Sequence, residues 1–165
     1  MKSFTLGLAV ALVASQAIAA DQPKPPANPG FDKLKSLVGE WKGNMKDEGE
    51  VRTTYRLVAA GSAIEETLSH GNMVTMYHPD GNSLMLTHYC AAHNQPRMRA
   101  ANFSAGDNVL KFLFVDASNM SDPNATHMHN LTFTFHDADH FTQEWTMYEG
   151  GKETQKVAMN FTRVK

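Results

Sequence analysis

The sequence has few of the features that carry a recognisable chemistry. It has one cysteine in 165 residues, Cys90, so no disulfide can form within the chain. It contains none of the short motifs of serine hydrolases, zinc peptidases, phosphate-binding loops or dinucleotide-binding folds. Its 15 basic and 17 acidic residues give a formal charge of −2, with no basic excess for nucleic acid. These absences argue against the common enzyme classes and against nucleic-acid binding.

Long hydrophobic runs are also missing, apart from one near the N-terminus. Residues 1–20 combine one positive charge (Lys2), an apolar run over 6–13 and the small-residue sequence Ala17-Ile18-Ala19. This order is typical of a cleavable signal peptide, and the run is shorter than the roughly 20 apolar residues that span a bilayer. We therefore predict an exported protein, periplasmic or extracellular, without a transmembrane segment. In such a compartment a free thiol is open to oxidation, so Cys90 is expected to be buried, metal-bound or paired with another chain.

The remainder divides into a short tether and one domain. Residues 21–30 hold four prolines, which disfavour helix and sheet and favour an extended linker. Apolar residues over 31–38 then recur at helical spacing, and Gly39 follows as a helix stop. We expect residues 31–165 to form a single domain of ordinary size.

After this helix, short segments rich in Val, Thr, Tyr and Phe alternate between apolar and polar residues. Turn sequences such as Pro79-Asp80-Gly81-Asn82 separate them. The ten segments expected to form strands are 39–46, 50–58, 63–69, 72–78, 83–90, 96–104, 109–115, 127–135, 140–148 and 154–163. The pattern predicts an all-β protein, an antiparallel up-and-down β-barrel of about ten strands with a short N-terminal helix. A two-sheet sandwich is the alternative.

Two places in the sequence resemble the calycin superfamily, the lipocalin and fatty-acid-binding type of barrel. Gly39-Glu40-Trp41 opens the first predicted strand directly after the helix, as in the lipocalin G-x-W pattern, and Arg163 ends the last strand. The resemblance implies that Arg163 packs over Trp41 and closes one end of the barrel. The strand number is similar to that of fatty-acid-binding proteins and nitrobindins. Nitrobindins, however, hold haem through a histidine near the C-terminus, and here no histidine follows His140.

The segments 86–90 and 94–98 are similar to stretches of uncharacterised bacterial secreted proteins, a likeness that implies no activity. With Trp41 and Arg163 at the closed end, the up-and-down topology places several histidines at the open end. One hypothesis is a zinc or copper site there, since imidazole and thiolate suit both metals. Its ligands would be His88, Cys90, His93, His127 and His129. Histidines that only bind water or backbone at a wet barrel mouth are the alternative. Methionines inside strands, such as Met73 and Met147, are expected to fill the core.

Polar residues on inward faces favour a pocket inside the barrel. Tyr55 and Glu66 share faces with apolar neighbours, so they need partners or water. Arg97 and Arg99 lie near the open end, where an inward arginine could hold a carboxylate. The alternation of that strand is ambiguous, so outward positions are equally compatible with it.

The leading functional hypothesis is a barrel that binds a small apolar or amphipathic molecule. The expected contacts are Tyr55, Glu66, His88, Arg97, Arg99 and His129. A metal-binding or haem-binding protein is the first alternative. A small barrel enzyme of the isomerase or hydrolase type is the second, with an imidazole or carboxylate as general base. The sequence leaves the ligand and the oligomeric state open.

Overall fold

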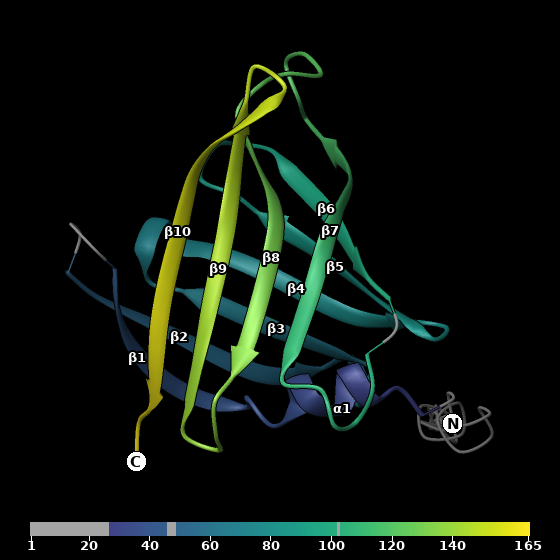
Figure 1. Ribbon diagram of the computed structural model, residues 1–165, viewed down its shortest axis with the longest axis vertical. Coiled ribbons are helices and arrows are strands. Elements are labelled where there is room, and N and C mark those ends of the chain that lie inside the picture. Colours follow the sequence, from purple (N-terminus) through teal and green to yellow (C-terminus); the bar gives the residue numbers. More distant parts are fainter. Residues whose placement is uncertain (1–26, 46–48, 102) are drawn as a thin grey trace, which may run out of the picture.

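Ten antiparallel strands form one closed barrel, and a short helix lies at one end (Figure 1). The computed structural model describes residues 27–45, 49–101 and 103–165, so the predicted signal peptide lies outside the described residues. The elements are α1 (Pro29–Lys35), β1 (Gly39–Met45), β2 (Gly49–Val58), β3 (Ala63–Leu68), β4 (Met73–Asp80), β5 (Ser83–Tyr89), β6 (Gln95–Ala100), β7 (Val109–Ser118), β8 (His127–Phe135), β9 (His140–Glu149) and β10 (Lys152–Arg163).

Each strand pairs with its neighbours in sequence, and β1 closes the barrel by pairing with both β2 and β10. In the register, Trp41 of β1 faces Thr53 on one side and Arg163 on the other. Closure joins the first and last strands, so the barrel has no free first or last edge. The predicted all-β up-and-down barrel is therefore confirmed, and the two-sheet sandwich is excluded.

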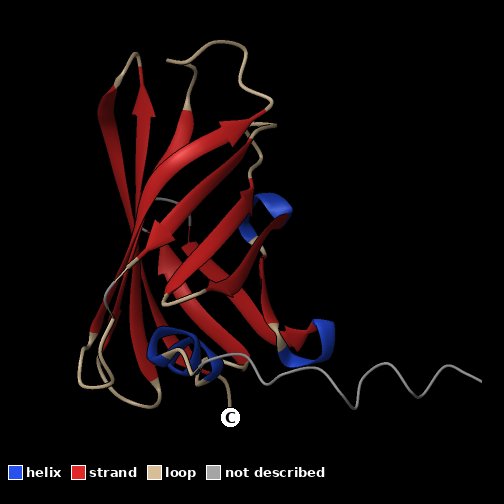
Figure 2. Cartoon of the chain, turned by 90° about the vertical axis from the view of Figure 1, so that its right-hand side faces the viewer, coloured by secondary structure: helices blue, strands red, loops and turns tan. Residues whose placement is uncertain are grey.

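Helix α1 begins earlier than the sequence pattern predicts. The side chain of Asn28 accepts a hydrogen bond from the backbone N–H of Phe31 at 3.0 Å and caps the helix, and Pro29 suits the first turn. Residues 29–30 thus belong to the helix and not to the predicted tether. The helix buries Phe31 and Leu34, and Figure 2 shows it across the lower end of the strands. No helix in the described parts of the chain is long and apolar enough to cross a membrane.

Strands β6 and β7 also differ from the predicted limits. β6 ends at Ala100 instead of residue 104, while β7 continues to Ser118 instead of residue 115. Side-chain pairs across the two strands accompany this extension: Arg97 binds Asp116 with two hydrogen bonds of 2.6 and 2.5 Å. The hydroxyl of Ser118 donates to Gln95 at 2.9 Å. These polar pairs lie on the outer face of the barrel, so the alternation of apolar residues does not reveal that the strand continues there.

Inward-facing aromatic side chains fill the barrel near the helix. The rings of Trp41 and Phe141 meet edge to face at 4.7 Å, and Tyr77 lies 5.7 Å from Phe112 and 6.0 Å from Phe133. All five side chains are almost completely buried. Large buried rings dominate the packing energy of such a core. Packed side chains therefore fill this end of the lumen.

The closed end is held by the pair that the calycin resemblance implied. The guanidinium of Arg163 lies 4.1 Å from the centre of the Trp41 ring. It also donates to the carbonyl oxygens of Ser36, Val38 and Ala138 at 2.7, 3.1 and 3.1 Å. These contacts join the last strand to the segment after α1 and to the β8–β9 turn. A planar fork of donors suits several carbonyls at once.

Arg163→Met keeps a long apolar side chain over Trp41 but removes the donors to three carbonyl oxygens. We expect it to lower the free energy of unfolding by about 2 kcal/mol, because the hydrogen bonds and the cation–π contact are both lost. Urea unfolding followed by tryptophan fluorescence measures this change. Arg52→Met is the matched control, since Arg52 is exposed and its side chain pairs with the exposed Glu50. Equal losses in the two variants would contradict the closing role of Arg163.

Candidate functional site

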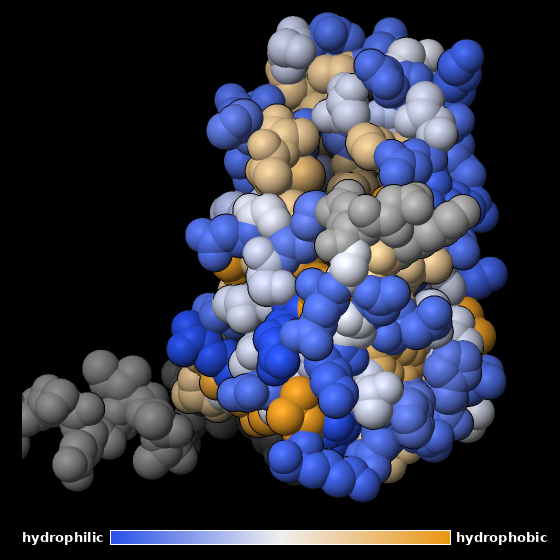
Figure 3. Space-filling view, turned by 90° about the vertical axis from the view of Figure 1, so that its left-hand side faces the viewer, coloured by the Kyte–Doolittle hydropathy of each residue, from blue (hydrophilic) through white to orange (hydrophobic). Residues whose placement is uncertain are grey.

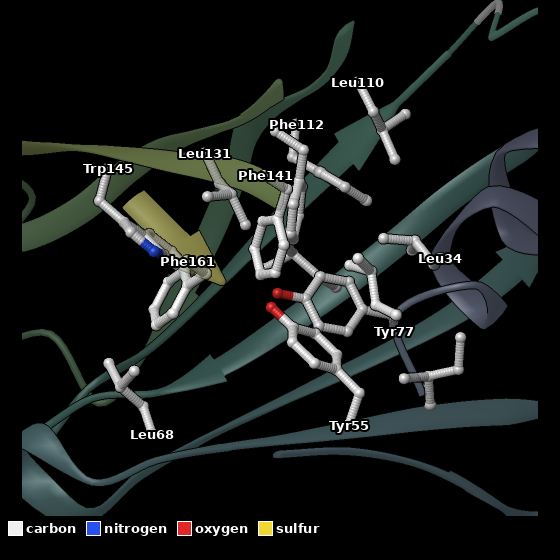
Figure 4. Packing of buried hydrophobic residues seen from close by; sticks show 14 of the residues in the cluster. Leu34, Tyr55, Leu68, Tyr77, Leu110, Phe112, Leu131, Phe141, Trp145 and Phe161 are labelled. Carbon is white, nitrogen blue, oxygen red and sulfur yellow. The ribbon is translucent and has the colours of Figure 1, made fainter. Parts of the chain in front are cut away.

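A buried carboxylate lies at mid-height in the barrel. Glu66 of β3 is 2% exposed and receives hydrogen bonds from four side chains on β2, β4 and β9. The Tyr77 hydroxyl donates to Oε2 at 2.5 Å. Tyr55, Gln143 and Thr53 donate to Oε1 at 2.8, 2.8 and 3.0 Å. Figure 4 shows the hydroxyls of Tyr55 and Tyr77 turned toward the same point. We call these five residues the Glu66 network.

Burial and hydrogen bonding act on Glu66 in opposite directions. Removal from water is the larger effect and raises the pKa of its carboxyl group above the ordinary value, although the four donors lower it. Burial, with the nearby Glu66 charge, raises the pKa values of Tyr55 and Tyr77 well above 10, so both phenols keep their protons and donate. Gln143 also donates to the Tyr55 oxygen at 2.7 Å. Four converging donors match an ionised carboxylate, which only accepts hydrogen bonds.

His88 lies beside this network on β5 and is 3% exposed. Its Nδ1 is 2.8 Å from the hydroxyl oxygen of Thr75, its partner in the register of β4. Its ring lies 4.6 Å from the ring of Trp145, which reaches across the lumen from β9. In the part of the chain that the structure describes, Nε2 of His88 has no hydrogen-bond partner. Burial lowers the pKa of His88 to about 4, so the imidazole is neutral at neutral pH.

The tautomer of His88 decides the role of its second ring nitrogen. The hydroxyl of Thr75 can accept from Nδ1–H or donate to an unprotonated Nδ1. When Nδ1 carries the proton, Nε2 has the lone pair and is an acceptor or a metal ligand. In the other tautomer Nε2–H is a donor.

Above the Glu66 network the lumen is not filled. A cavity of about 250 Å³ lies at the open end of the barrel and has a mainly apolar wall. We call it the open-end cavity; its lining residues are Met45, Leu68, His70, Met73, His88, Cys90, Ala91, Ala92, Met128, Trp145, Met147, Gln155, Val157 and Met159. Figure 3 shows apolar atoms around a hollow in the upper part of a largely hydrophilic face. Five of the ten methionines of the chain belong to this wall.

The strand register orders these layers. On β4 the successive inward residues are Met73 in the cavity wall, Thr75, and Tyr77 in the aromatic core. On β9 the same sequence of layers is Trp145, Gln143 and Phe141, and Trp145 Nε1 donates to the amide oxygen of Gln143 at 3.3 Å. The polar layer thus separates a packed lower lumen from a cavity open at the top.

The structure places Arg97 and Arg99 away from this cavity. Between them, Met98 is completely buried, so the two arginines face outward on β6. Arg97 pairs with Asp116 at 2.5 Å and Arg99 pairs with Asp80 at 2.5 Å, both at the surface. The inward orientation considered for a carboxylate ligand is therefore not observed. Tyr55, Glu66 and His88 do face the lumen, as expected.

The five residues of the expected metal cluster do not come together. His88 and Cys90 line the cavity, whereas His93 lies in an exposed turn with a φ of 64°. His127 and His129 instead bind each other, with a separation of 3.0 Å between Nε2 and Nδ1. Within residues 27–45, 49–101 and 103–165, no three His, Cys, Asp or Glu side chains form a metal-binding group.

A β-bulge explains why the two β8 histidines, His127 and His129, do not line the cavity as the alternation predicts. The register between β8 and β9 shifts between Met128 and Asn130, so alternation fails at His129. Met128, and not its histidine neighbours, contributes to the cavity wall. The ring of His129 stacks between Phe114 at 4.5 Å and Tyr148 at 3.7 Å. The extra residue of a bulge turns side chains away from the face that alternation predicts.

A larger hollow, of about 600 Å³, lies at the closed end between α1 and the turns around Gly61 and Pro79. Its polar side chains already have partners: Lys35 binds Asp32 at 2.9 Å, and Asn28 donates to the Ser83 carbonyl at 2.9 Å. It contains no buried group without a partner among the residues described. We therefore place the candidate site at the open end, despite the smaller volume.

Sequence reasoning missed Thr75, Gln143 and Trp145. Gln143 is 77 residues away from Glu66, and no local pattern links an amide to so distant a carboxylate. Alternation along β9 did contain a signal, since Gln143 shares the inward face of Phe141 and Trp145. A polar residue in that position needs a buried partner.

The fold has counterparts among solved structures. The structure of Rv2717c from M. tuberculosis matches with a TM-score of 0.58 at 13% identity, covering 85% of this chain and 100% of that one. A protein of unknown function from the DUF3598 family of Nostoc punctiforme matches with a TM-score of 0.54 at 14% identity and 88% coverage. This chain spans 53% of the Nostoc protein. No family model and no curated protein matches the sequence. At these identities the likeness concerns the fold alone.

Removal of one donor tests the Glu66 network. Tyr77→Phe leaves the buried carboxylate with one hydrogen bond fewer and is expected to lower the free energy of unfolding by about 2 kcal/mol. In a Glu66→Gln background the same substitution should cost less, because the acceptor is neutral. Chemical unfolding of the four proteins of this double-mutant cycle measures the coupling. Tyr89→Phe, at a half-exposed tyrosine, is the control. Additive effects of the two network substitutions would refute a charge-assisted bond.

His88 predicts a pH dependence of stability. Its pKa is about 4 in the folded protein and near 6.5 in an unfolded chain, so between these values only the unfolded state binds the proton. Stability from this residue is complete above pH 6.5 and declines as the pH falls toward 4, by up to ~3 kcal/mol. Urea unfolding at about pH 7 and about pH 4.5 measures the loss, which should shrink in His88→Gln. His78→Gln, at an exposed histidine of the closed end, should keep the wild-type dependence.

Proposed function

We propose that this protein is exported and binds a small, uncharged, mainly apolar molecule in the open-end cavity. The signal-peptide pattern of residues 1–20 supports export. The G-x-W pattern at Trp41 and its packing under Arg163 support a place among the calycin-like barrels, whose usual role is to hold such ligands.

One observation carries the choice of ligand class: an apolar cavity whose wall contains a buried imidazole nitrogen without a partner among the residues described. Five methionines with Leu68, Val157 and Trp145 provide the apolar surface. Methionine side chains adapt their shape to different ligands. Nε2 of His88 supplies one hydrogen bond to a polar group of the ligand, as acceptor or donor according to the tautomer. Binding sites commonly combine an apolar wall with a few placed polar groups.

The charge of the wall argues for a neutral ligand. Among the residues described, no lysine or arginine lines this cavity, and Arg97 and Arg99 are paired on the outer surface. A carboxylate would therefore lose its hydration without gaining a cationic partner there. A volume of about 250 Å³ also limits the ligand to a small molecule.

Calorimetric titration with 1-octanol and with octanoate tests this proposal. We expect 1-octanol to bind and octanoate to bind at least about tenfold more weakly, a difference of ~1.4 kcal/mol. Val157→Trp, which fills the cavity from β10, should abolish 1-octanol binding. Val115→Trp, on the exposed face of β7, is the matched control and should bind like wild type. Tighter binding of octanoate, or equal binding by both variants, would refute the proposed site.

A further inference from the structure

The open-end cavity has a second chemical property, which is its set of soft donor atoms. Its wall contains the imidazoles of His70 and His88, five thioethers and the thiol of Cys90, and no carboxylate from the residues described. His88 is buried and neutral, and its Nε2 has no hydrogen-bond partner among those residues. A mainly apolar wall could be built from leucine and isoleucine alone. The concentration of sulfur around a free imidazole nitrogen therefore calls for a separate explanation.

The strand register brings several of these donors near His88. Thr75 of β4 pairs with His88 of β5, so Met73 lies one inward position further toward the open end, level with Cys90. On β9 the ring of Trp145 contacts His88, and Met147 is the next cavity residue toward the open end. Met128 of β8 pairs with Met147. Three thioethers from three strands thus lie on the open side of the imidazole.

The soft donor atoms of the cavity wall indicate which metal ion it would bind. Thioethers and a neutral imidazole suit monovalent copper, whereas magnesium and calcium need oxygen ligands. Zinc sites usually take three or four ligands from thiolate, imidazole and carboxylate groups, and among the residues described no three such side chains form a group. A single positive charge also costs less to bury than a double charge.

We propose that the open-end cavity binds Cu(I) through Nε2 of His88 and the thioethers of Met73, Met128 and Met147. Coordination through Nε2 would leave the proton on Nδ1, where the Thr75 hydroxyl, 2.8 Å away, would accept it and orient the ring, as outer partners of metal-binding histidines commonly do. Every ligand is neutral in the free protein, so binding releases no proton and involves no redox step when the metal is supplied as Cu(I). An apolar ligand and Cu(I) would compete for the same space, but either can bind in the absence of the other. Failure of one proposal therefore leaves the other untouched.

Methionine methyl groups report the site directly. Protein labelled with ¹³C at the methionine methyls is titrated with Ag(I), a redox-stable substitute for Cu(I), and followed by proton–carbon correlation spectra. We expect the signals of Met73, Met128 and Met147 to shift, with saturation at one equivalent. Met76 and Met85, on the outer faces of β4 and β5, should stay in place. Shifts at all five methionines, or no shift, would overturn the proposal.

Affinity measurements on matched variants test the same site. Cu(I) is supplied under reducing, oxygen-free conditions against a coloured Cu(I) chelator. The triple variant Met73→Leu, Met128→Leu and Met147→Leu keeps the cavity apolar and should weaken binding by well over tenfold, more than loss of an outer partner does. The control Met76→Leu with Met85→Leu removes thioethers outside the site and should bind like wild type. Equal affinity in the triple variant and the control would also overturn the proposal.

Should the triple variant fail to fold, the spectra of the wild-type protein still decide the question. The separate calorimetric result with 1-octanol tells whether the cavity accepts an apolar molecule. Octanol binding without silver-induced shifts would leave the ligand proposal standing and end the copper proposal. Silver-induced shifts without octanol binding would do the reverse.

Discussion

A carboxylate that is shut away from water needs hydrogen-bond donors, and this need organises the middle of the barrel. Glu66 obtains four donors from β2, β4 and β9, strands that meet only because the barrel is closed. Each donor is itself buried, so the cost of leaving any of them unpaired would be high. The network therefore fixes the inward side chains of several strands relative to one another. Loss of closure at Trp41 and Arg163 would deprive it of this geometry.

The same polar layer divides the lumen into two unlike halves. Toward helix α1 aromatic rings fill the lumen, and such packing favours stability. Toward the open end the wall is made of adaptable methionine side chains and surrounds a cavity. His88 lies between the halves: its Nδ1 is hydrogen-bonded to Thr75, while its Nε2 has no partner among the residues described. The residue proposed to contact the ligand is therefore held next to the polar layer.

Sequence patterns predicted the parts of this arrangement that depend on local periodicity. Alternation located the strands, turn sequences separated them, and G-x-W with Arg163 identified the closed end. The inward direction of Tyr55, Glu66 and His88 followed from the same rule. Alternation failed at His129, where a bulge inserts one residue, and it was ambiguous at Arg97, whose outward partner Asp116 is distant in sequence. The sequence pattern predicts core filling for Met73 and Met147, which line the cavity, because periodicity tells which residues face inward and not where space remains.

Native mass spectrometry of the protein purified without an affinity tag from the cells that naturally produce it tests the central proposal most directly. We expect a protein ion that carries an additional small mass, which disappears on unfolding and is absent from Val157→Trp prepared in the same way. The mass itself distinguishes an organic molecule from a copper ion. A spectrum that shows the protein without an adduct for the wild type, or the same adduct on Val157→Trp, would contradict a function located in the open-end cavity.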